Sequence, residues 1–250
     1  MATTTATLLD MAEVGQGTRV LAVGCGTGEE ALAAAALVGP TGEVVGTDLS
    51  AAMIEIARDL ADAAGVQNAQ FHVMDAQRLE FPPASFDAVI ARNSLMFVPD
   101  LGGALAEIRR VLRPAGRVGA TVWSAGSRNP RISAPMAAAR ALGVIPPETS
   151  TYRIALRLSR PSVLAAALRQ AGFHHLSVRR VTLMAPYADL DEAVTGALEQ
   201  SATRELVGLL GPDGGGRMRR SLARRLARYS TPEGTNLPGE QLVAAASVRA

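Results

Sequence analysis

Residues 20–30 read VLAVGCGTGEE: an apolar run is followed by three glycines at alternate positions and then by two glutamates. The apolar run predicts a buried strand, and the glycines predict a tight turn, because glycine adopts backbone angles that other residues avoid. The next stretch, EEALAAAALVG, predicts a helix that starts at this turn. A strand that leads through glycines into a helix is typical of α/β proteins that bind nucleoside-containing ligands.

The alternation of strand and helix continues along the chain as far as residue 123. We expect strands at 19–24, 43–48, 69–75, 86–91 and 117–123, and helices at 29–39, 51–65 and 101–116. This order is typical of βαβ units and a parallel sheet. Beyond it, we expect a loop-rich stretch at 124–160, a helix at 160–173, a sixth strand at 174–186, mostly helical residues at 188–236 and a last strand at 240–248.

Composition narrows the class of protein. No apolar run reaches the roughly 18 residues of a membrane span, and the N-terminal stretch MATTTATLLD lacks the basic and apolar regions of a secretion signal. We therefore expect a cytoplasmic protein with no membrane partner. The single cysteine, Cys25, excludes a disulfide framework and a cysteine-rich metal site, so no metal is expected. All 25 basic residues are arginine, which excludes lysine-based chemistry.

Charge is distributed unevenly along the chain. Residues 1–125 carry 8 arginines against 14 acidic residues, whereas residues 126–250 carry 17 arginines against 9. The second half therefore favours anionic substrates or partners. An uneven solvated surface is the alternative explanation of the same pattern.

Charge also bears on the ligand of the glycine turn. The dinucleotide spacing G-x-G-x-x-A is satisfied from Gly26 to Ala31, and Asp48 ends the next strand, where a carboxylate can accept both ribose hydroxyls. A dinucleotide would place its pyrophosphate at the start of the helix, where Glu29 and Glu30 would repel it. We therefore expect a phosphate-free, cationic cofactor and disfavour a nicotinamide-dependent oxidoreductase, although both glutamates also stabilise the helix dipole.

Four motifs follow one another in the first half: VLAVGCGTG at 20–28, VVGTDLSAAMIEIAR at 44–58, MDAQRLEFPPASFDAVIARNSLMFVPD at 74–100 and ALAEIRRVLRPAGRV at 104–118. Together they resemble the class I S-adenosylmethionine-dependent methyltransferases, specifically the UbiE-like small-molecule group. The resemblance covers about residues 8–123, with a weaker likeness at 160–173. It implies S-adenosyl-L-methionine as the cofactor and S-adenosyl-L-homocysteine as the product.

The pattern and the resemblance together predict the fold. We expect a single α/β domain spanning 1–250, with a Rossmann-like, seven-stranded, mostly parallel sheet flanked by helices. The cofactor-binding core is expected at about 8–123. Helical cap insertions are expected at about 124–160, after the fifth strand, and at about 184–240, between the sixth and seventh strands.

The resemblance also implies ten cofactor-binding residues: Gly24, Gly26, Gly28, Asp48, Leu49, Met53, Asp75, Ala76, Arg92 and Asn93. The glycines are expected on the methionine and ribose side of the cofactor, and Asp48 on the ribose hydroxyls. Asp75 matches the acid that accepts a hydrogen bond from the adenine amino group. Arg92 lies in the segment expected near the methyl group, and a surface ion pair is the alternative interpretation of this residue. For Met53, the alternative is ordinary helix packing.

One position departs from the family pattern. An acid usually stands two residues before the first glycine, where this chain has Ala22. The resemblance implies a methyltransferase that acts on O, N or C of a small or medium-sized metabolite, in bacterial secondary or cofactor metabolism. Because of Ala22, a protein of this fold that binds the cofactor without methyl transfer, such as a cyclase or regulatory subunit, stays open as the alternative.

Residues outside the core supply the candidates for acceptor chemistry. A general base is needed only when the acceptor must lose a proton. His174, His175 and Tyr152 are weak candidates for that base, with ordinary strand-edge roles as the alternative for the histidines. Trp123, at the end of the fifth strand, is a candidate for the wall of the substrate pocket.

The stretch RMRRSLARRLARYS at 217–230 predicts a basic helix with an apolar stripe formed by Met218, Leu222 and Leu226. It suits a lid over the pocket, a site for an acidic partner or a solvated surface helix. No nucleic-acid-binding motif accompanies it, so nucleic acid is not expected as a partner. The sequence leaves the oligomeric state open, with a homodimer among the alternatives.

Overall fold

The computed structural model describes residues 3–249, which form two compact units. Unit 1 comprises the described residues up to Val122, Arg160–Val181 and the residues from Leu242 onward. Unit 2 comprises Trp123–Ser159 and Thr182–Gln241, two segments that overlap the expected cap insertions. No helix among the described residues combines the length and apolar character needed to cross a membrane.

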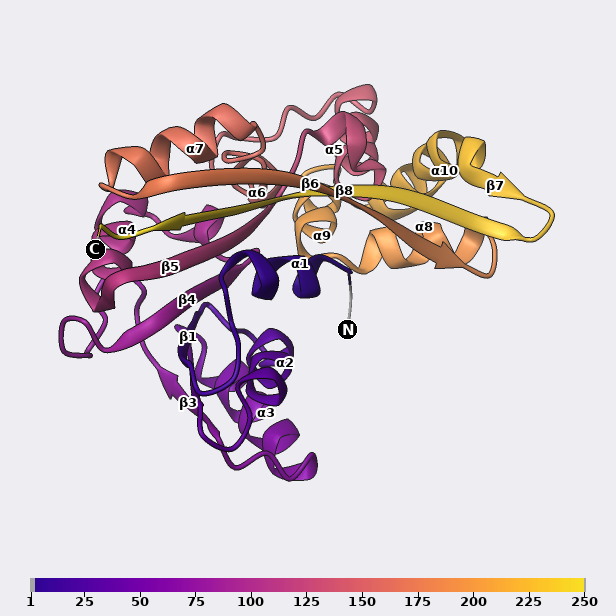
Figure 1. Ribbon diagram of the computed structural model, residues 1–250. Coiled ribbons are helices and arrows are strands. Elements are labelled where there is room, and N and C mark those ends of the chain that lie inside the picture. The colour runs from indigo at the N-terminus through magenta and orange to yellow at the C-terminus, as the bar shows by residue number, and fades with distance from the viewer. Residues whose placement is uncertain (1–2, 250) are drawn as a thin grey trace. The chain divides into compact units, whose positions relative to one another are not determined.

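Parallel strands form the centre of unit 1 (Figure 1). They are β1 (Arg19–Val23), β2 (Glu43–Asp48), β3 (Ala69–Val73), β4 (Phe86–Arg92) and β5 (Leu112–Trp123). Within the sheet order β3-β2-β1-β4-β5-β8-β6, all neighbours among these five pair in parallel. The chain moves outward from β1 to β3 and then returns to β4 on the other side of β1. In such sheets, ligands bind where this reversal opens a crevice at the carboxyl ends of the strands.

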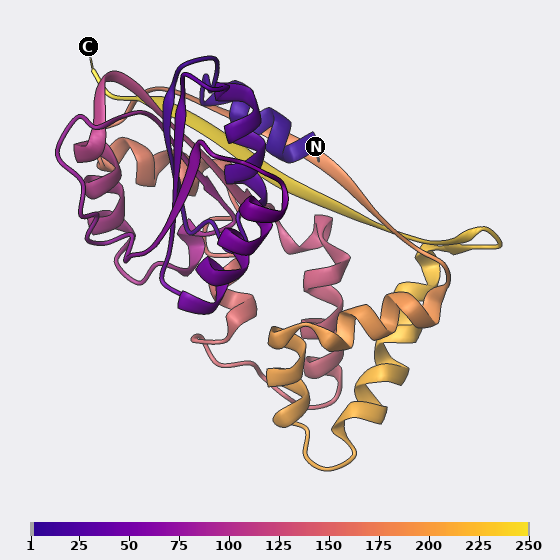
Figure 2. The same ribbon diagram turned by 90° about the horizontal axis from the view of Figure 1, so that it is seen from below.

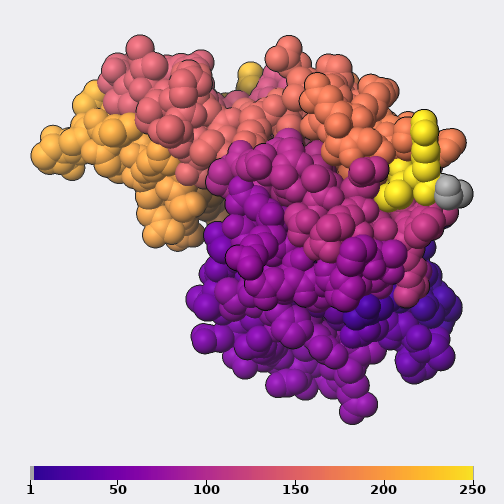
Figure 3. Space-filling model, turned by 90° about the vertical axis from the view of Figure 1, so that its left-hand side faces the viewer, coloured from indigo at the N-terminus to yellow at the C-terminus, as the bar shows by residue number. Residues whose placement is uncertain are grey.

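In the described part of unit 1, five helices accompany these strands: α1 (Thr3–Met11), α2 (Glu29–Val38), α3 (Ala51–Ala63), α4 (Leu101–Val111) and α7 (Pro161–Gln170). A 3-10 turn, η1 (Leu95–Phe97), precedes α4. The side chain of Ser50 caps α3, and that of Asp100 caps α4 by accepting a hydrogen bond from the N–H of Gly103 at 2.9 Å. Figure 3 shows the face of unit 1 on which α4 and α7 pack side by side.

The boundary between α4 and β5 differs from the expectation. The helix ends at Val111 instead of continuing to residue 116, and β5 begins at once with Leu112, which pairs with Phe86 of β4. Pro114 explains the early end, because a proline disfavours helical geometry in the residue before it.

Among residues 3–249, the sheet has eight strands, one more than the seven expected. β6 (His174–Tyr187) and β8 (Gly234–Ser247) complete the sheet, and the unexpected strand is β7 (Ser230–Thr231), which pairs with β8 in antiparallel fashion. A strand of two residues is too short to show the alternation of apolar and polar residues by which strands are recognised.

Hydrogen bonds fix the direction of β8 relative to β5. In unit 1, the N–H of Val248 donates to the carbonyl of Gly116 at 2.9 Å. In unit 2, the N–H of Ser124 donates to the carbonyl of Glu240 at 3.1 Å. The residue number rises along one strand as it falls along the other, so β8 is antiparallel to β5. The sheet is therefore mostly parallel, with an antiparallel strand at β8.

Unit 2 is mostly helical (Figure 2). Its helical elements are η2 (Gly126–Arg128), α5 (Pro130–Ala141), α6 (Thr151–Ala155), α8 (Leu190–Glu199), α9 (Ser201–Gly208), α10 (Gly214–Leu226) and η3 (Ala227–Tyr229). α10 packs against α5 and α8, and its expected apolar stripe of Met218, Leu222 and Leu226 is fully buried in the core of the unit. These three side chains therefore pack against other residues of unit 2.

Candidate cofactor-binding site

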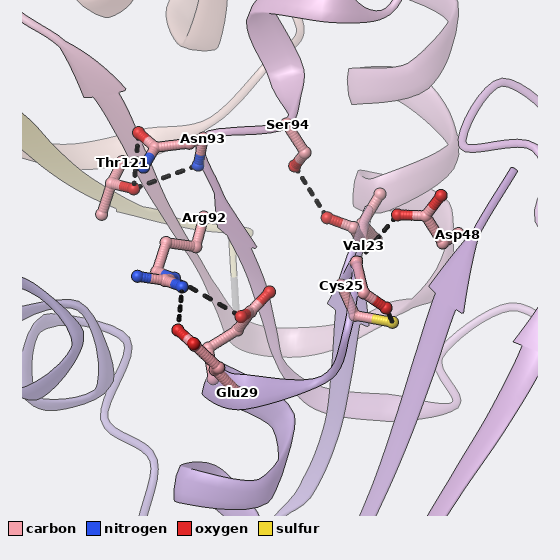
Figure 4. A network of polar contacts seen from close by, with 10 residues as sticks. Val23, Cys25, Glu29, Asp48, Arg92, Asn93, Ser94 and Thr121 are labelled. Carbon is pink, nitrogen blue, oxygen red and sulfur yellow. Dashed lines mark hydrogen bonds and ion pairs between the residues drawn. The ribbon is translucent and has the colours of Figure 1, made fainter. Parts of the chain in front are cut away.

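The glycine turn joins β1 to α2 and approaches the segment after β4 closely. Gly24, Gly26 and Gly28 have positive φ angles of 63°, 54° and 86°, which favour glycine. A side chain at Gly24 would in addition meet a neighbour, since its Cβ atom would lie 2.4 Å from Cβ of Ser94. Ser94 donates a hydrogen bond to the carbonyl of Val23 at 2.7 Å (Figure 4). The turn and the segment after β4 are therefore held together at one edge of the sheet.

Backbone donors from two elements hold the carboxylate of Asp48 at the end of β2. Its Oδ2 accepts a hydrogen bond from the N–H of Gly26 at 2.9 Å (Figure 4). Its Oδ1 accepts one from the N–H of Ser50 at 2.9 Å. Each carboxylate oxygen can accept more than one hydrogen bond. Asp48 is therefore fixed in place and keeps acceptor capacity for the paired hydroxyls of a ribose.

The segment after β4 begins with a polar residue in an uncommon backbone conformation. Asn93 has a φ of 54°. Its N–H donates to the carbonyl of Thr121 in β5 at 3.0 Å and to the hydroxyl of the same residue at 3.1 Å. The Thr121 hydroxyl in turn donates to Oδ1 of Asn93 at 3.4 Å (Figure 4). These bonds fix Asn93 at the carboxyl edge of the sheet.

Asp75 follows β3 and is held by a neighbour in the chain. The backbone N–H of Gln77 donates to Oδ1 of Asp75 at 2.9 Å, and the Gln77 side-chain amide donates to both carboxylate oxygens at 3.0 Å. These hydrogen bonds lower the pKa of Asp75 below its ordinary value. The side-chain oxygen of Gln77 accepts from the N–H of Asp100 at 3.0 Å, which ties this segment to the start of α4. Asp75 is therefore an oriented, ionised hydrogen-bond acceptor.

These segments border a cavity of about 370 Å³, a size within the usual range of small-molecule sites. The described residues that line it are Gly24, Asp48, Leu49, Met74, Asp75, Ala76, Gln77, Asn93, Ser94, Phe97, Val98 and Pro99. The side chains of Leu49 and Phe97 are 73% and 48% exposed. The lining therefore offers apolar contacts together with two acids, and it includes no basic residue.

Six of the ten residues expected to bind the cofactor line this cavity: Gly24, Asp48, Leu49, Asp75, Ala76 and Asn93. Gly26 and Gly28 shape the turn, and Met53 lies on α3 outside the lining. The lining also includes six residues that the sequence motifs did not predict: Met74, Gln77, Ser94, Phe97, Val98 and Pro99. Their signal is positional, because all six follow shortly after the ends of β3 and β4.

Arg92, the fourth expected residue outside the lining, forms ion pairs with both acids at the start of α2. Its Nη2 lies 2.7 Å from Oε2 of Glu29, and its Nε lies 3.4 Å from Oε2 of Glu30 (Figure 4). Glu30 is 3% exposed, and this burial raises the pKa of its carboxyl to about 7 against the opposing effect of Arg92. The start of α2 thus carries two carboxylates, where a phosphate ligand would need hydrogen-bond donors.

The histidine candidates lie away from this cavity. His174 and His175 begin β6, and a Cβ atom on Gly172 would lie 3.4 Å from the guanidinium of Arg109, in the last turn of α4. α4 starts next to the cavity after β4 and ends where β5 begins, at the opposite edge of the sheet. Neither histidine is among the described residues that line this cavity, and the role of either as a base stays a prediction.

Tyr152 and Trp123 lie together in unit 2, where both line a second cavity of about 140 Å³. Burial raises the pKa of the Tyr152 hydroxyl to about 12, which disfavours it as a base near neutral pH.

Cys25 is 2% exposed, and burial raises the pKa of its thiol to about 12, so it is an unreactive core residue. Within residues 3–249, no cluster of three or more His, Cys, Asp or Glu could hold a metal ion.

The cavity in unit 1 fits S-adenosylmethionine. Asp48 suits the ribose hydroxyls, Asp75 suits the adenine amino group, and the exposed side chains of Leu49 and Phe97 suit the faces of the adenine ring. A lining with two acids and no basic residue suits a cationic ligand without phosphate. Because S-adenosylmethionine carries no phosphate, the acids at the start of α2 are compatible with it.

Comparisons with known proteins agree with this geometry. Residues 20–116 match the family model for the methyltransferase domain. The nocamycin O-methyltransferase of Saccharothrix syringae is 31% identical over 236 residues, which cover 89% of this chain and 82% of that protein. The aklanonic acid methyltransferase DauC of Streptomyces sp. (strain C5) is 43% identical over 122 residues, but these cover only 48% of this chain and 56% of DauC.

A solved structure shows the same fold. The YcgJ protein from Bacillus subtilis superposes with a TM-score of 0.66 at 20% identity, covering 99% of this chain and 98% of that one. The fold and the cavity define an α/β protein that binds a phosphate-free nucleoside cofactor. The chain belongs to the class I S-adenosylmethionine-dependent methyltransferases, as the likeness along most of its length to the nocamycin enzyme shows. The cofactor of this family is S-adenosylmethionine.

Proposed function

We propose that this chain transfers the methyl group of S-adenosylmethionine to a small or medium-sized metabolite. Oxygen is the favoured acceptor atom, because the relative that aligns along most of the chain is named an O-methyltransferase. Nitrogen and carbon acceptors are the alternatives. The names of the nocamycin and aklanonic acid enzymes support a substrate from bacterial secondary metabolism.

The observation that carries this proposal is the position of Asp48. Its carboxylate is held by the N–H groups of Gly26 and Ser50 and lines the cavity at the carboxyl edge of the sheet. A fixed carboxylate can receive both ribose hydroxyls without first losing side-chain freedom. S-Adenosylmethionine, when bound, supplies a methyl group on a positively charged sulfur as the electrophile.

The residues of unit 1 hold and orient the cofactor and take no part in bond making or breaking. Asp48 holds the ribose, Asp75 holds the adenine amino group, and Leu49 and Phe97 exclude water from the ring. Asn93, fixed by its bonds to Thr121, lies on the methionine side. Alignment of the two reacting atoms supplies much of the acceleration in a displacement reaction. The two ionisable residues of the lining, Asp48 and Asp75, are both assigned to the cofactor. An acceptor whose oxygen is already ionised at neutral pH would react without a base from this lining.

We assign recognition of the acceptor to unit 2 and propose that both units belong to one methyltransferase domain. The segments of unit 2 lie outside the stretch at 20–116 that matches the family model. They are predominantly helical and contain a cavity of their own. A cap of this kind would select the substrate while unit 1 keeps the cofactor chemistry constant.

A protein that binds the cofactor without transferring a methyl group is the second candidate. The observation that favours it is Ala22, which is fully buried in β1 at the position where the family usually carries an acid. Without that acid, the methionine ammonium would depend on other acceptors. Binding of the cofactor without release of S-adenosylhomocysteine in an acceptor screen would favour this second function.

Calorimetric titration tests the proposal directly. The purified chain is titrated with S-adenosylmethionine, S-adenosylhomocysteine and NADH, and the titrations are repeated on Asp48→Ala. We expect micromolar binding of both S-adenosyl ligands, a loss of about 10-fold or more in the variant, and no binding of NADH. Asp59→Ala, which removes an exposed acid on α3, serves as the matched control and should bind normally.

The outcomes separate the alternatives. Binding of NADH without binding of the S-adenosyl ligands would show that the charge argument is wrong. Binding of the S-adenosyl ligands that survives Asp48→Ala would show that the cofactor lies elsewhere. An acceptor screen scored by release of S-adenosylhomocysteine then tests the transfer itself.

A further inference from the structure

The cavity of about 140 Å³ in unit 2 has a mixed lining. Four of its residues are apolar or largely so, Trp123, Ile132, Ala155 and Ala202, and four carry polar or charged groups, Arg131, Thr151, Tyr152 and Gln200. A hydrocarbon cavity of about 150 Å³ admits a benzene molecule. The cavity in unit 2 is therefore of a size suited to one six-membered ring.

Hydrogen bonding in the lining leaves a donor without a partner. The hydroxyls of Tyr152 and Thr203 are 2.6 Å apart, and the Tyr152 hydroxyl donates to Oε1 of Gln200 at 3.5 Å. With Oε1 directed to the tyrosine, the Gln200 amide presents Nε2 on its other side. This Nε2 is buried and finds no hydrogen-bond partner within the described residues. A ligand oxygen that accepts from Nε2 would give this donor the partner that the described residues do not supply.

A positive charge lies beside this donor. Arg131, in the first turn of α5, lines the same cavity, is exposed and makes no ion pair with any residue that the structure describes. Its charge reaches the interior of the cavity, since it acts on the Tyr152 hydroxyl. Glu205 is the acid that contacts the lining, and its Oε2 accepts a hydrogen bond from the Thr151 hydroxyl at 3.0 Å. Arg131 is thus available to a ligand anion.

We propose that this cavity binds an anionic ring of the methyl acceptor, a single six-membered ring that bears a carboxylate or enolate oxygen. The inference rests on the proposed function, in which unit 2 recognises the acceptor. The apolar wall of Trp123 and Ile132 holds the ring, Gln200 donates its Nε2–H to the oxygen, and Arg131 supplies the countercharge. The acceptor class is therefore an aromatic or enolised cyclic acid, in which this oxygen is an anchor.

Trp123 makes this subsite directly observable, because it is the single tryptophan of the chain. Its fluorescence is followed while the protein is titrated with benzoate and, separately, with the neutral isostere benzamide. We expect a saturable change with benzoate and a dissociation constant at least about 10-fold higher for benzamide, which lacks the charge-assisted contact. The experiment needs no cofactor and no knowledge of the natural substrate.

Variants assign the effect to the two polar groups. Arg131→Ala should weaken benzoate binding about 10-fold and abolish the preference for benzoate over benzamide. Gln200→Glu, which keeps the shape but replaces the donor with an anion, should abolish benzoate binding. Arg140→Ala is the matched control, because Arg140 is exposed on the same helix and does not line the cavity. Unchanged melting temperatures would show that the variants are folded.

The results distinguish this inference from the proposed function. If benzoate leaves the fluorescence of Trp123 unchanged up to millimolar concentration, or if Arg131→Ala and Gln200→Glu bind benzoate as the wild type does, the inference is wrong. Calorimetry with S-adenosylhomocysteine on the same preparation reports on the cofactor site alone. A preparation that binds S-adenosylhomocysteine but not benzoate therefore overturns only the subsite.

Discussion

Arg92 Nε lies 3.4 Å from Oε2 of Glu30, a carboxylate that is 3% exposed at the start of α2. The same guanidinium holds the exposed Glu29 through its Nη2. One cation from the end of β4 thus faces two acids, and burial raises the pKa of the Glu30 carboxyl to about 7 despite this cation. The charge at the start of the cofactor-facing helix therefore changes within the physiological pH range.

The stability of the protein should depend on pH through Glu30. The folded pKa of about 7 lies above the ordinary value of 4.5. The stabilisation linked to protonation is therefore fully present below about pH 4.5 and is lost as the pH rises through about 7. Relative to Glu30→Gln, the wild type should lose about 3 kcal/mol of unfolding free energy between pH 4.5 and pH 8 in urea titrations. Glu29→Gln, at an exposed site, should keep the wild-type profile, and parallel profiles for wild type and Glu30→Gln would refute this linkage.

Gly24→Ala should destabilise the protein more than Gly26→Ala. Both positions have positive φ angles, which cost an alanine about 1–2 kcal/mol. At Gly24 the new Cβ also meets Ser94 at 2.4 Å, whereas nothing lies within 4 Å at Gly26. Overpacking adds about 1–3 kcal/mol at Gly24 alone. Denaturant unfolding measures the difference, and Ser94→Gly should narrow it; equal losses at the two glycines would argue against this close approach.

Asp75 should report on the adenine amino group. Asp75→Ala removes an ionised acceptor that two hydrogen-bond donors of Gln77 hold in place. We expect the affinity for S-adenosylhomocysteine to fall about 10-fold or more, with little change for the analogue in which hypoxanthine replaces adenine. Glu80→Ala removes a nearby exposed acid and serves as the control. Equal losses for both ligands would show that Asp75 acts on the fold of the loop.

The basic helix α10 should matter for stability through its apolar side. Leu222 is fully buried in the core of unit 2, and Leu222→Ala should lower the unfolding free energy by about 2–5 kcal/mol. Arg224→Ala, on the exposed side of the same helix, should change it by less than about 0.5 kcal/mol. Trp123 belongs to unit 2 and is the single tryptophan, so its fluorescence follows this unfolding. A comparable effect of the two substitutions would contradict the packing described for α10.

Local pattern was sufficient for the core of unit 1. The boundaries of β2 coincide with the expected strand at 43–48, and Ser50 caps the expected helix. Asp48 ends β2 and Asp75 follows β3, two strands whose direction is fixed by the βαβ connection, so their meeting at one edge follows from the order of elements. Gly24 was recognisable for the same reason, since a turn between a strand and a helix needs a residue that tolerates positive φ.

Other features depend on partners distant in the chain. β7 is defined by its pairing with β8, and the start of β5 by the pairing of Leu112 with Phe86. His174 and His175 resemble base candidates in the sequence, but the course of α4 and α7 places them at the far edge of the sheet. No local pattern encodes such an outcome, because it is decided by packing.

The sequence by itself determined the class of cofactor, through a glycine turn, two acids at the start of the helix and a carboxylate at the end of the next strand. These are local features, and the strand–helix geometry translates them directly into a site. Only the tertiary structure decided what faces that site and what does not. It pairs Arg92 with Glu30 across 62 positions of sequence and brings Trp123 to the same cavity as Tyr152 and Gln200. Such contacts depend on how whole elements pack, and packing is a property of the folded chain rather than of any stretch of it.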